Sequence, residues 1–360
     1  MDRLSALPTG RHMRAALEDM PSTLNETYAD ILAKVPDSNK DIVREALMWL
    51  CFSRQPLTPS QLAEAVVLEE SDRSLDDDCR LKPADSILDI CRTWIQVDDD
   101  LVTLAHDSIR SFLTTSWIRT SPVAEYALDP RACHKAMMRK CLAYISFDEF
   151  AAGYVDRWAR LEKRFDDWPL LDYASVFWPH HAQRCELAAS DEKLMLDMFA
   201  TKAHKRGGVF ESWVQCLIQS TDAASIRRTE PLYYAASYNM VAVIKILLRP
   251  GSGTRVDQRG GRFACTPLSI ACFRRNTEAA KLLLEAGADP DAYDAVLTTP
   301  RNLAARRKMD DVLELMGKRM GRLSVSKDEP AQQGVGEATA PEGPGDADAL
   351  NKENQSSRGT

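Results

Sequence analysis

The residues best suited to chemistry lie in the segment LVTLAHDSIRSFL, residues 101 to 113. An apolar pattern typical of a strand ends there on Ala-His-Asp, and a helical pattern follows. His106 and Asp107 therefore stand at a strand-to-helix junction, where they could exchange protons with a substrate or sense a bound nucleotide. The third interpretation is structural: Asp107 caps the helix from Ser108 to Leu113, and His106 bonds nearby backbone.

Other candidate chemistry is incomplete. His180, His181 and Cys185 could suggest a metal site, but neighbouring histidines on a helix point about 100° apart, and no further cysteine or carboxylate cluster completes a tetrahedral set. The sequence holds neither the nucleophile motif G-x-S-x-G nor the phosphate-binding motif G-x-x-x-x-G-K-[ST]. We therefore predict that the chain is not an enzyme, has no catalytic residues and holds no metal or cofactor.

An internal repeat organises the C-terminal half. Pro231, Pro267 and Pro300 fall into one register, 36 and 33 residues apart. Each proline begins a short helix, which a polar break separates from a second amphipathic helix. The three units read EPLYYAASYNMVAVIKILLRPG, TPLSIACFRRNTEAAKLLLEAG and TPRNLAARRKMDDVLELMGKRM.

These units resemble ankyrin repeats, most closely in the middle unit with TPLSIA and LLLEAGADPDA. Arg275 and Lys308 depart from the family, because they stand where glycine usually ends the first helix, and only Asn239 is a natural substitute. The resemblance implies a short stack over about residues 225–322, with a degenerate last repeat. Since about three repeats are the usual minimum, the stack should lean on the preceding helices.

The resemblance also implies a protein-binding face, because hairpin tips and inner helices are the variable parts of an ankyrin stack. Aromatic and arginine side chains on such a face are typical of binding hot spots. The alternative is that Phe263 and Phe273 only fill the crowded space between fingers. The predicted binding residues are Tyr238, Asp257, Arg262, Phe263, Phe273, Arg274, Tyr293, Arg306 and Arg307.

The N-terminal half predicts helices followed by a hairpin. Three amphipathic helices are expected between residues 21 and 70, the third opened by Thr58-Pro59 as N-cap and first helical residue. A short fourth helix over 83–91 leads into two alternating segments around Asp98-Asp99-Asp100. This order predicts a winged helix over about residues 21–120.

The motifs LMWLCFSRQPLTPSQLAEAV, ILDICRTWIQVDDDLVTLAHDSIRSFL and PLLDYASVFWPHHAQ are similar to the winged-helix and connector region of fungal NACHT-ankyrin proteins, a region also labelled the GPI inositol-deacylase winged helix. The resemblance implies a helical connector over 125–222 and a lead-in over 1–20 that looks like the end of an NTPase module. The chain would be a truncated member without that module. In related NTPases a His-Asp pair touches bound ADP, and Leu104-Ala105-His106-Asp107 resembles that motif.

Composition limits the partners. Residues 225–323 carry 17 Lys and Arg against 10 Asp and Glu, while the whole chain has a net charge of -7. The basic part favours acidic partners or solvated helix faces. Duplex DNA binding, the rival use of a winged helix, is disfavoured because the third helix, SQLAEAVVLEE, and the wing tip are acidic.

The rest of the composition predicts a soluble, cytoplasmic or nuclear protein. Nine cysteines without a C-x-x-C pair are typical of reduced, buried thiols, and no apolar run resembles a signal peptide or a membrane span. The tail from residue 323 to 360 has the composition of a disordered segment. Within it, Lys352-Glu353-Asn354 resembles a KEN degradation signal.

We therefore predict a mainly α protein: winged helix with a small β-hairpin, helical connector, short ankyrin stack and disordered tail. Its predicted function is to bind another protein through the ankyrin concave face, in NLR-like signalling or scaffolding. It would bind no small-molecule substrate, no nucleic acid and no membrane. The alternative is a fragment that senses the nucleotide state of a separate NACHT NTPase chain.

Overall fold

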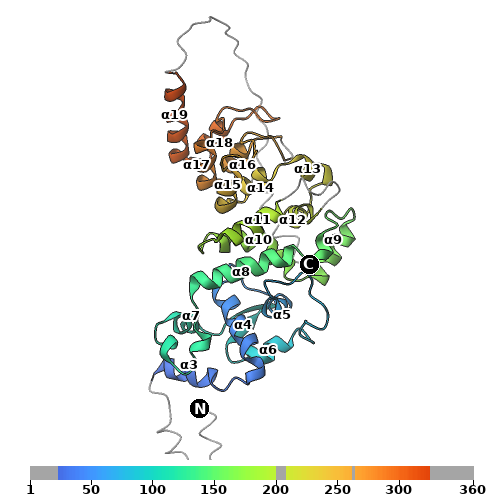
Figure 1. Cartoon of the computed structure of the whole chain (residues 1–360), viewed down its shortest axis with the longest axis vertical. Coiled ribbons are helices and arrows are strands. Elements are labelled where there is room, and N and C mark those ends of the chain that lie inside the picture. The colour runs from blue at the N-terminus through green and yellow to red at the C-terminus, as the bar shows by residue number, and fades with distance from the viewer. Residues whose placement is uncertain (1–22, 200–207, 262–263, 325–360) are drawn as a thin grey trace, which may run out of the picture. The chain divides into compact units, whose positions relative to one another are not determined.

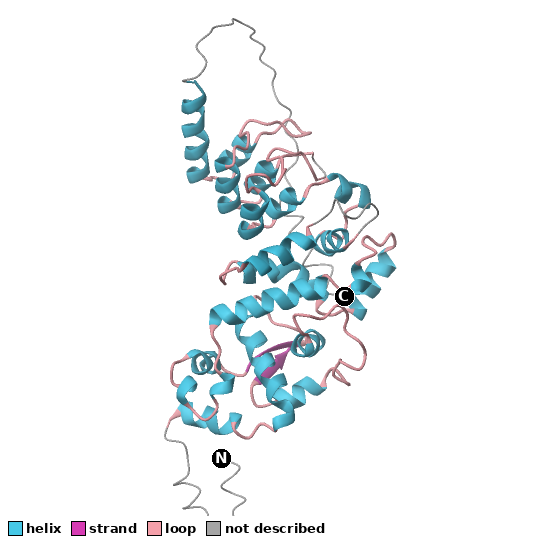
Figure 2. Cartoon of the chain, in the orientation of Figure 1, coloured by secondary structure: helices cyan, strands magenta, loops and turns pink. Residues whose placement is uncertain are grey.

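The computed structural model describes residues 23–199, 208–261 and 264–324. Within these ranges the protein is mainly helical with one two-stranded sheet, as predicted (Figures 1 and 2). The residues up to Met316 form one unit and those from Gly317 a second, and all packing discussed below lies within the first. The predicted lead-in over 1–20, the tail from residue 325 and the KEN sequence lie outside the described residues.

The predicted N-terminal helices are present and begin at polar caps. The Thr23 side chain accepts a hydrogen bond from Glu26 N, and the Thr58 side chain accepts one from Gln61 N, so two helices begin with a capping box. The predicted helix over 83–91 is shorter and begins at Ser86. The elements are α3 (Leu24–Leu32), α4 (Lys40–Phe52), α5 (Pro59–Val67) and α6 (Ser86–Cys91), with a 3-10 turn at Asp37–Asn39.

The predicted hairpin follows α6 and is confirmed. Strands β1 (Ile95–Asp98) and β2 (Leu101–Leu104) pair antiparallel, with Asp98 opposite Leu101. Asp99 and Asp100 both have positive φ, 47° and 61°, which is the backbone of a tight type I′ turn. Leu57 also bonds to β2, since Val102 N donates to its carbonyl at 2.7 Å. The wing is thereby attached to the start of α5.

Helix α5 is covered on most of its surface. Leu62, Ala63 and Val66 are buried with the other apolar residues of this part of the chain. Glu64 is also buried, and its carboxylate accepts hydrogen bonds from Tyr144 Oη and, at 3.2 Å, from Leu170 N. The helix that would read DNA in a winged helix is therefore packed into the protein.

A set of helices connects the winged helix to the repeats. Helices α8 and α10 pack closely along each other, and the Trp213 indole of α12 donates to Ser175 O of α10 at 3.0 Å. These helices are α8 (Pro130–Ile145), α9 (Trp158–Asp167), α10 (Leu171–Ala182), α11 (Ala189–Met198), α12 (Val209–Leu217) and α13 (Ala223–Arg228).

Three helix pairs form the ankyrin stack. Thr266 and Thr299 cap the second and third inner helices through hydrogen bonds to Ser269 N and Asn302 N, and a proline follows each cap. The inner helices α14, α16 and α18 pack in sequence, as do the outer helices α15 and α17. The pairs are α14 (Pro231–Ser237) with α15 (Val241–Leu247), α16 (Pro267–Phe273) with α17 (Thr277–Glu285), and α18 (Pro300–Arg306) with α19 (Asp310–Ser324).

The connector covers the N-terminal side of this stack. Helix α11 contacts α15, and Glu192 forms a two-bond ion pair with Arg249 at 2.7 and 2.8 Å. Gln183 donates to Asn239 O at 2.7 Å, and the rings of Phe210 and Tyr234 meet edge to face. The preceding helices thus protect the first repeat, as the short length of the stack predicts.

Each inner helix ends on a left-handed residue. Asn239, Arg275 and Lys308 follow the three inner helices with φ of 53°, 60° and 55°. Asparagine tolerates this conformation, and the Asn239 Oδ1 also accepts a hydrogen bond from Ala279 N at 3.2 Å. Arginine and lysine have no such compensation, because their Cβ atoms are crowded at positive φ. Two of the three helix ends are therefore strained.

We expect Arg275→Gly and Lys308→Gly each to raise the free energy of unfolding by about 0.5 to 1 kcal/mol, because glycine relieves the strain at positive φ. Asn239→Gly is the matched control. It should lower stability by about 1 kcal/mol, because it removes the hydrogen bond to Ala279 N. Calorimetric or urea unfolding measures all three variants. Equal effects at the three positions would contradict this account.

Candidate functional site

The ends of the inner helices gather most of the predicted binding residues. Tyr238, Arg274 and Arg307 are the C-cap residues of α14, α16 and α18, so the stacking of these helices places them in one row. Phe273 and Arg306 precede two of these caps. The Arg307 guanidinium lies over the Phe273 ring at 5.1 Å from its centroid, a cation-π contact between successive repeats.

These five side chains, Tyr238, Phe273, Arg274, Arg306 and Arg307, are named here the inner-helix row. Arg274 and Arg306 are exposed, and the other three are half-buried. Burial raises the pKa of Tyr238 to about 12, and the nearby charge of Arg274 opposes that shift. Phe273 packs partly against the hydrophobic core, so both interpretations of this residue have support: it contributes to the core and to the surface.

The remaining predicted residues lie on the fingers, the loops that join an outer helix to the next inner helix, and they differ in their exposure and contacts. The Asp257 carboxylate accepts hydrogen bonds from Asp289 N at 3.0 and 3.2 Å, so it ties the first finger to the second. Tyr293 is 58% exposed at the tip of the next finger. Arg262 and Phe263 lie outside the described residues. Tyr293 is therefore available for contact with a partner, whereas Asp257 holds the two fingers together.

An apolar tip on the same finger was not predicted. Val296 and Leu297 are 63% and 78% exposed, next to the exposed Tyr293. The buried Asp294 carboxylate accepts hydrogen bonds from Val296 N and Thr298 N at 3.0 and 2.8 Å, which fixes the loop. The run Tyr-Asp-Ala-Val-Leu within a polar hairpin was the available sequence signal. Such clustered exposed apolar side chains are typical of contact surfaces.

At the junction of His106 and Asp107, the prediction that His106 bonds nearby backbone is confirmed, whereas the predicted helix cap is not. Helix α7 (Asp107–Thr114) begins with His106 as its N-cap, because His106 Nδ1 accepts from Ser108 N at 3.1 Å. The prediction that Asp107 caps this helix is wrong, since Asp107 is already the first helical residue. His106 Nδ1 also lies 2.7 Å from the Ser108 hydroxyl, which contacts Tyr28 Oη at 2.7 Å. The geometry of His106 is that of a helix cap.

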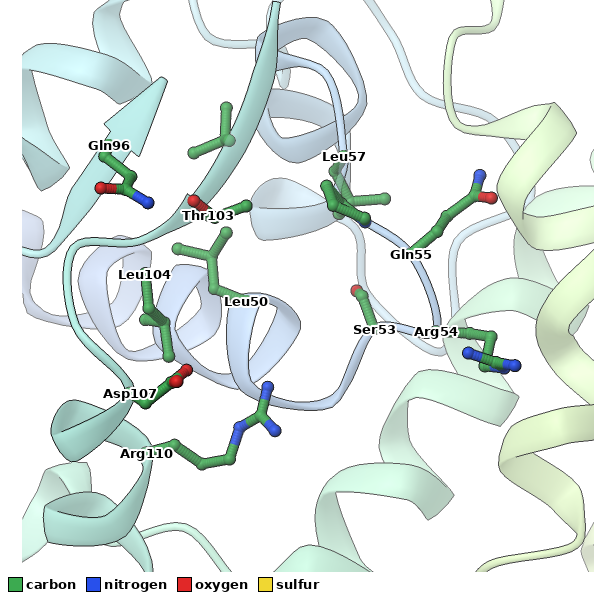
Figure 3. Close-up of a pocket in the computed structure, with 12 residues that line it drawn as sticks. Leu50, Ser53, Arg54, Gln55, Leu57, Gln96, Thr103, Leu104, Asp107 and Arg110 are labelled. Carbon is green, nitrogen blue, oxygen red and sulfur yellow. The ribbon is translucent and has the colours of Figure 1, made fainter. Parts of the chain in front are cut away.

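A pocket of about 340 Å³ opens beside this junction (Figure 3). Asp107 and Arg110 reach it from α7, while Ser53 and Arg54 come from the segment after α4. Figure 3 shows the guanidinium of Arg54 directed away from that of Arg110. The two cations do not converge, and Asp107 offsets part of their charge. The pocket therefore has mixed polarity without one focused point for an anion.

Of the candidate metal residues, only His181 belongs to a polar chain between α8 and α10. His134 Nδ1 lies 2.9 Å from His181 Nδ1, and His181 Nε2 lies 3.0 Å from Tyr173 Oη. Tyr173 Oη in turn accepts from Arg54 N at 3.0 Å. Cys185 does not join this chain, since its thiol contacts Ala182 O at 3.8 Å. Among the described residues, no group of three His, Cys, Asp or Glu side chains is arranged to hold a metal ion.

The protonation of these histidines is strongly disfavoured. Burial lowers the pKa of His181 to about 2, with further repulsion from His134, His180 and Arg184. Burial also lowers the pKa of His134 and of His180 to about 4, and Arg184 adds to both shifts. The cluster is therefore neutral at physiological pH and serves the packing of the connector.

The stacked helix pairs and the helices with their attached wing correspond to two known kinds of domain. Residues 198–319 match the family model for ankyrin repeats, in three copies, and residues 32–129 match the winged helix domain of GPI inositol-deacylase. Both domains are present in this chain. Domains of these two kinds are non-catalytic in general.

The chain is also similar to the azaphilone pigments biosynthesis cluster protein L of Monascus ruber, with 23% identity over 300 residues. That similarity covers 76% of this chain and 61% of the relative, so the chain spans about three fifths of the relative's length. None of the described helices is long and apolar enough to cross a lipid bilayer.

We expect the stability of the protein to fall as the pH is lowered from 7.5 to 5.5. The unfolded chain binds protons on its histidines near pH 6.5, whereas the folded chain does so only near pH 4 or below. His181 alone should lower the free energy of unfolding by about 1.4 kcal/mol at pH 5.5 relative to pH 7.5. Urea unfolding at several pH values measures the slope. The stability of the His181→Gln variant should depend less strongly on pH. An unchanged dependence in that variant would contradict the assignment of this effect to His181.

Proposed function

We propose that this protein is a non-catalytic binding module that captures another protein through the inner-helix row and the exposed tip of the finger that precedes α18. The observation that carries the proposal is the row itself: aromatic and arginine side chains from three successive repeats lie at one end of the inner helices. Arginine and aromatic residues dominate binding energy at protein interfaces. The protein would act in NLR-like signalling or scaffolding. The name of the Monascus ruber relative refers to a biosynthesis cluster and does not identify a binding partner.

The apolar finger tip supports the same proposal. Tyr293, Val296 and Leu297 expose apolar surface on a loop whose shape Asp294 fixes. A rigid loop loses little conformational entropy when it binds, so its contacts contribute more to affinity. The finger leads into the N-terminal cap of α18 at Thr299, whereas the inner-helix row lies at the C-terminal ends of the inner helices, so the two would be separate contact points on the stack.

Two other functions have less support. A nucleotide-state sensor beside a separate NACHT NTPase chain would need His106 to face a phosphate, but His106 instead caps α7. Duplex DNA binding would need α5 to enter a groove, but Leu62 to Val66 of that helix are buried and Gln61 donates to Pro169 O. Both functions would require these contacts to break first.

The double substitution Arg274→Ala with Arg306→Ala tests the proposal. Both side chains are exposed, so the folded state should keep its thermal stability. Partner capture, measured by affinity purification with quantitative mass spectrometry, should weaken by about 2 kcal/mol, roughly 30-fold. Phe273 is left intact because it also contacts the core.

A matched control is the double substitution Lys245→Gln with Arg255→Gln, which removes two exposed cations elsewhere in the repeats. It should capture the same proteins as the wild type. If no captured protein is lost with Arg274→Ala and Arg306→Ala, the inner-helix row is not the binding site.

A further inference from the structure

The inner-helix ends of repeats two and three carry five cationic side chains without an acidic partner. Arg274 and Arg275 end α16, and Arg306, Arg307 and Lys308 end α18. None of the five forms an ion pair with a carboxylate in the described part of the chain. Four of them are exposed. Arg307 is half-buried, and its guanidinium lies over the Phe273 ring.

Some other cations of the repeats are paired, whereas Lys245, Arg255 and Arg259 are exposed and form no ion pair among the described residues. Arg227 pairs with Glu211, Arg249 with Glu192, and Arg301 with Asp291. Lys281 of the outer helix α17 likewise lies 3.3 Å from the Asp311 carboxylate. Five of the unpaired cations in the described part of the repeats therefore lie together at the inner-helix ends. Positively charged patches of this kind attract negatively charged partners and orient them on approach.

Part of this charge has a structural use, because cations near a helix C-terminus interact favourably with the helix dipole. That effect is typically below about 1 kcal/mol at an exposed helix end and needs one cation per helix. It leaves one cation at the end of α16 and two at the end of α18 unexplained. The left-handed backbone of Arg275 and Lys308 adds a cost at those same positions.

On the basis of the proposed function, we propose that the partner presents an acidic segment in extended conformation, which lies across the ends of α16 and α18. The two helices pack directly against each other. Packed helix axes are about 8 to 10 Å apart, and a chain in the extended polyproline II conformation repeats its face every three residues and advances about 3.1 Å per residue. Acidic residues three positions apart in the partner therefore meet successive cationic clusters.

The inference predicts a spacing as well as a charge. Two pairs of acidic residues, the second beginning three residues after the first, match the two clusters at Arg274-Arg275 and Arg306-Arg307. Exposed arginines prefer two-bond contacts with carboxylates, so glutamate and aspartate are suitable ligands. Phe273, with Arg307 over it, separates the two clusters and offers an aromatic contact between them.

Fluorescence anisotropy with defined peptides on the full chain tests this inference. The probe is a labelled peptide with Glu-Glu-Ala-Glu-Glu at its centre. Comparison peptides carry Gln in place of Glu, or the same two Glu pairs separated by five further residues. We expect the first peptide to bind at least about tenfold more tightly than either comparison peptide, and to weaken as salt is raised.

Charge reversal provides the decisive variant. Arg274→Glu with Arg306→Glu should weaken binding of the glutamate peptide at least about tenfold, because two of the five cations become anions. Lys245→Gln with Arg255→Gln should leave glutamate-peptide affinity within about twofold of the wild type. Circular dichroism melting confirms that each variant is folded.

The outcomes separate this inference from the proposed function. Equal affinity for the glutamate and glutamine peptides would overturn the acidic segment, while the loss of a captured protein in Arg274→Ala with Arg306→Ala would still support the binding face. Tight glutamate binding that the charge-reversed variant retains would place the acidic site elsewhere and overturn the inference. Preference for the widely spaced peptide would overturn the extended geometry.

Discussion

The buried carboxylate of Glu64 is the contact on which the arrangement of the N-terminal half depends. It accepts hydrogen bonds from Tyr144 of α8 and from Leu170 N, and it pairs with Arg80. Burial raises the pKa of Glu64, while Tyr144, Arg80 and Leu170 favour its charged form. A buried acceptor with so many donors fixes geometry, because loss of any donor would leave polar groups unsatisfied. The third helix of the winged helix is therefore held inside the protein as a structural element.

The ankyrin stack depends on the same connector at its other side. Three helix pairs are close to the minimum for a stable stack, and the first pair alone would expose one apolar face. Glu192, Gln183 and Phe210 of the connector region contact the first repeat. Between repeats one and two, Asn276 donates to Ala236 O and Ser237 O, both at 2.8 Å, while Asn239 accepts from Ala279 N. Hydrogen bonds between the asparagine side chains and the backbone thus fix the orientation of repeat two relative to repeat one, in addition to the apolar packing.

Much of this architecture was predictable because it rests on local patterns. Proline spacing, capping threonines and the three-aspartate turn each determine nearby backbone, and the structure has the helices and the hairpin that they predict. Long-range contacts were not predictable. The sequence could not show that His106 and not Asp107 caps α7 or that Asp257 bonds the next finger, and it left open whether Phe273 packs inside the stack. The exposed Val296 and Leu297 were missed because apolar residues are normally expected inside.

The inner-helix ends show a conflict between local stability and surface charge. At the C′ position of an ankyrin inner helix glycine is preferred, because the backbone has positive φ. The first repeat meets this demand with Asn239, which also bonds its neighbour, but the second and third place Arg275 and Lys308 there. Departures from a local rule without local compensation are typical of functional positions. The strained pair lies beside Arg274 and Arg307, where it extends the unpaired positive charge of the row. Strain and charge at the same two positions are most simply explained together if the charge itself is what this end of the stack presents to its partner.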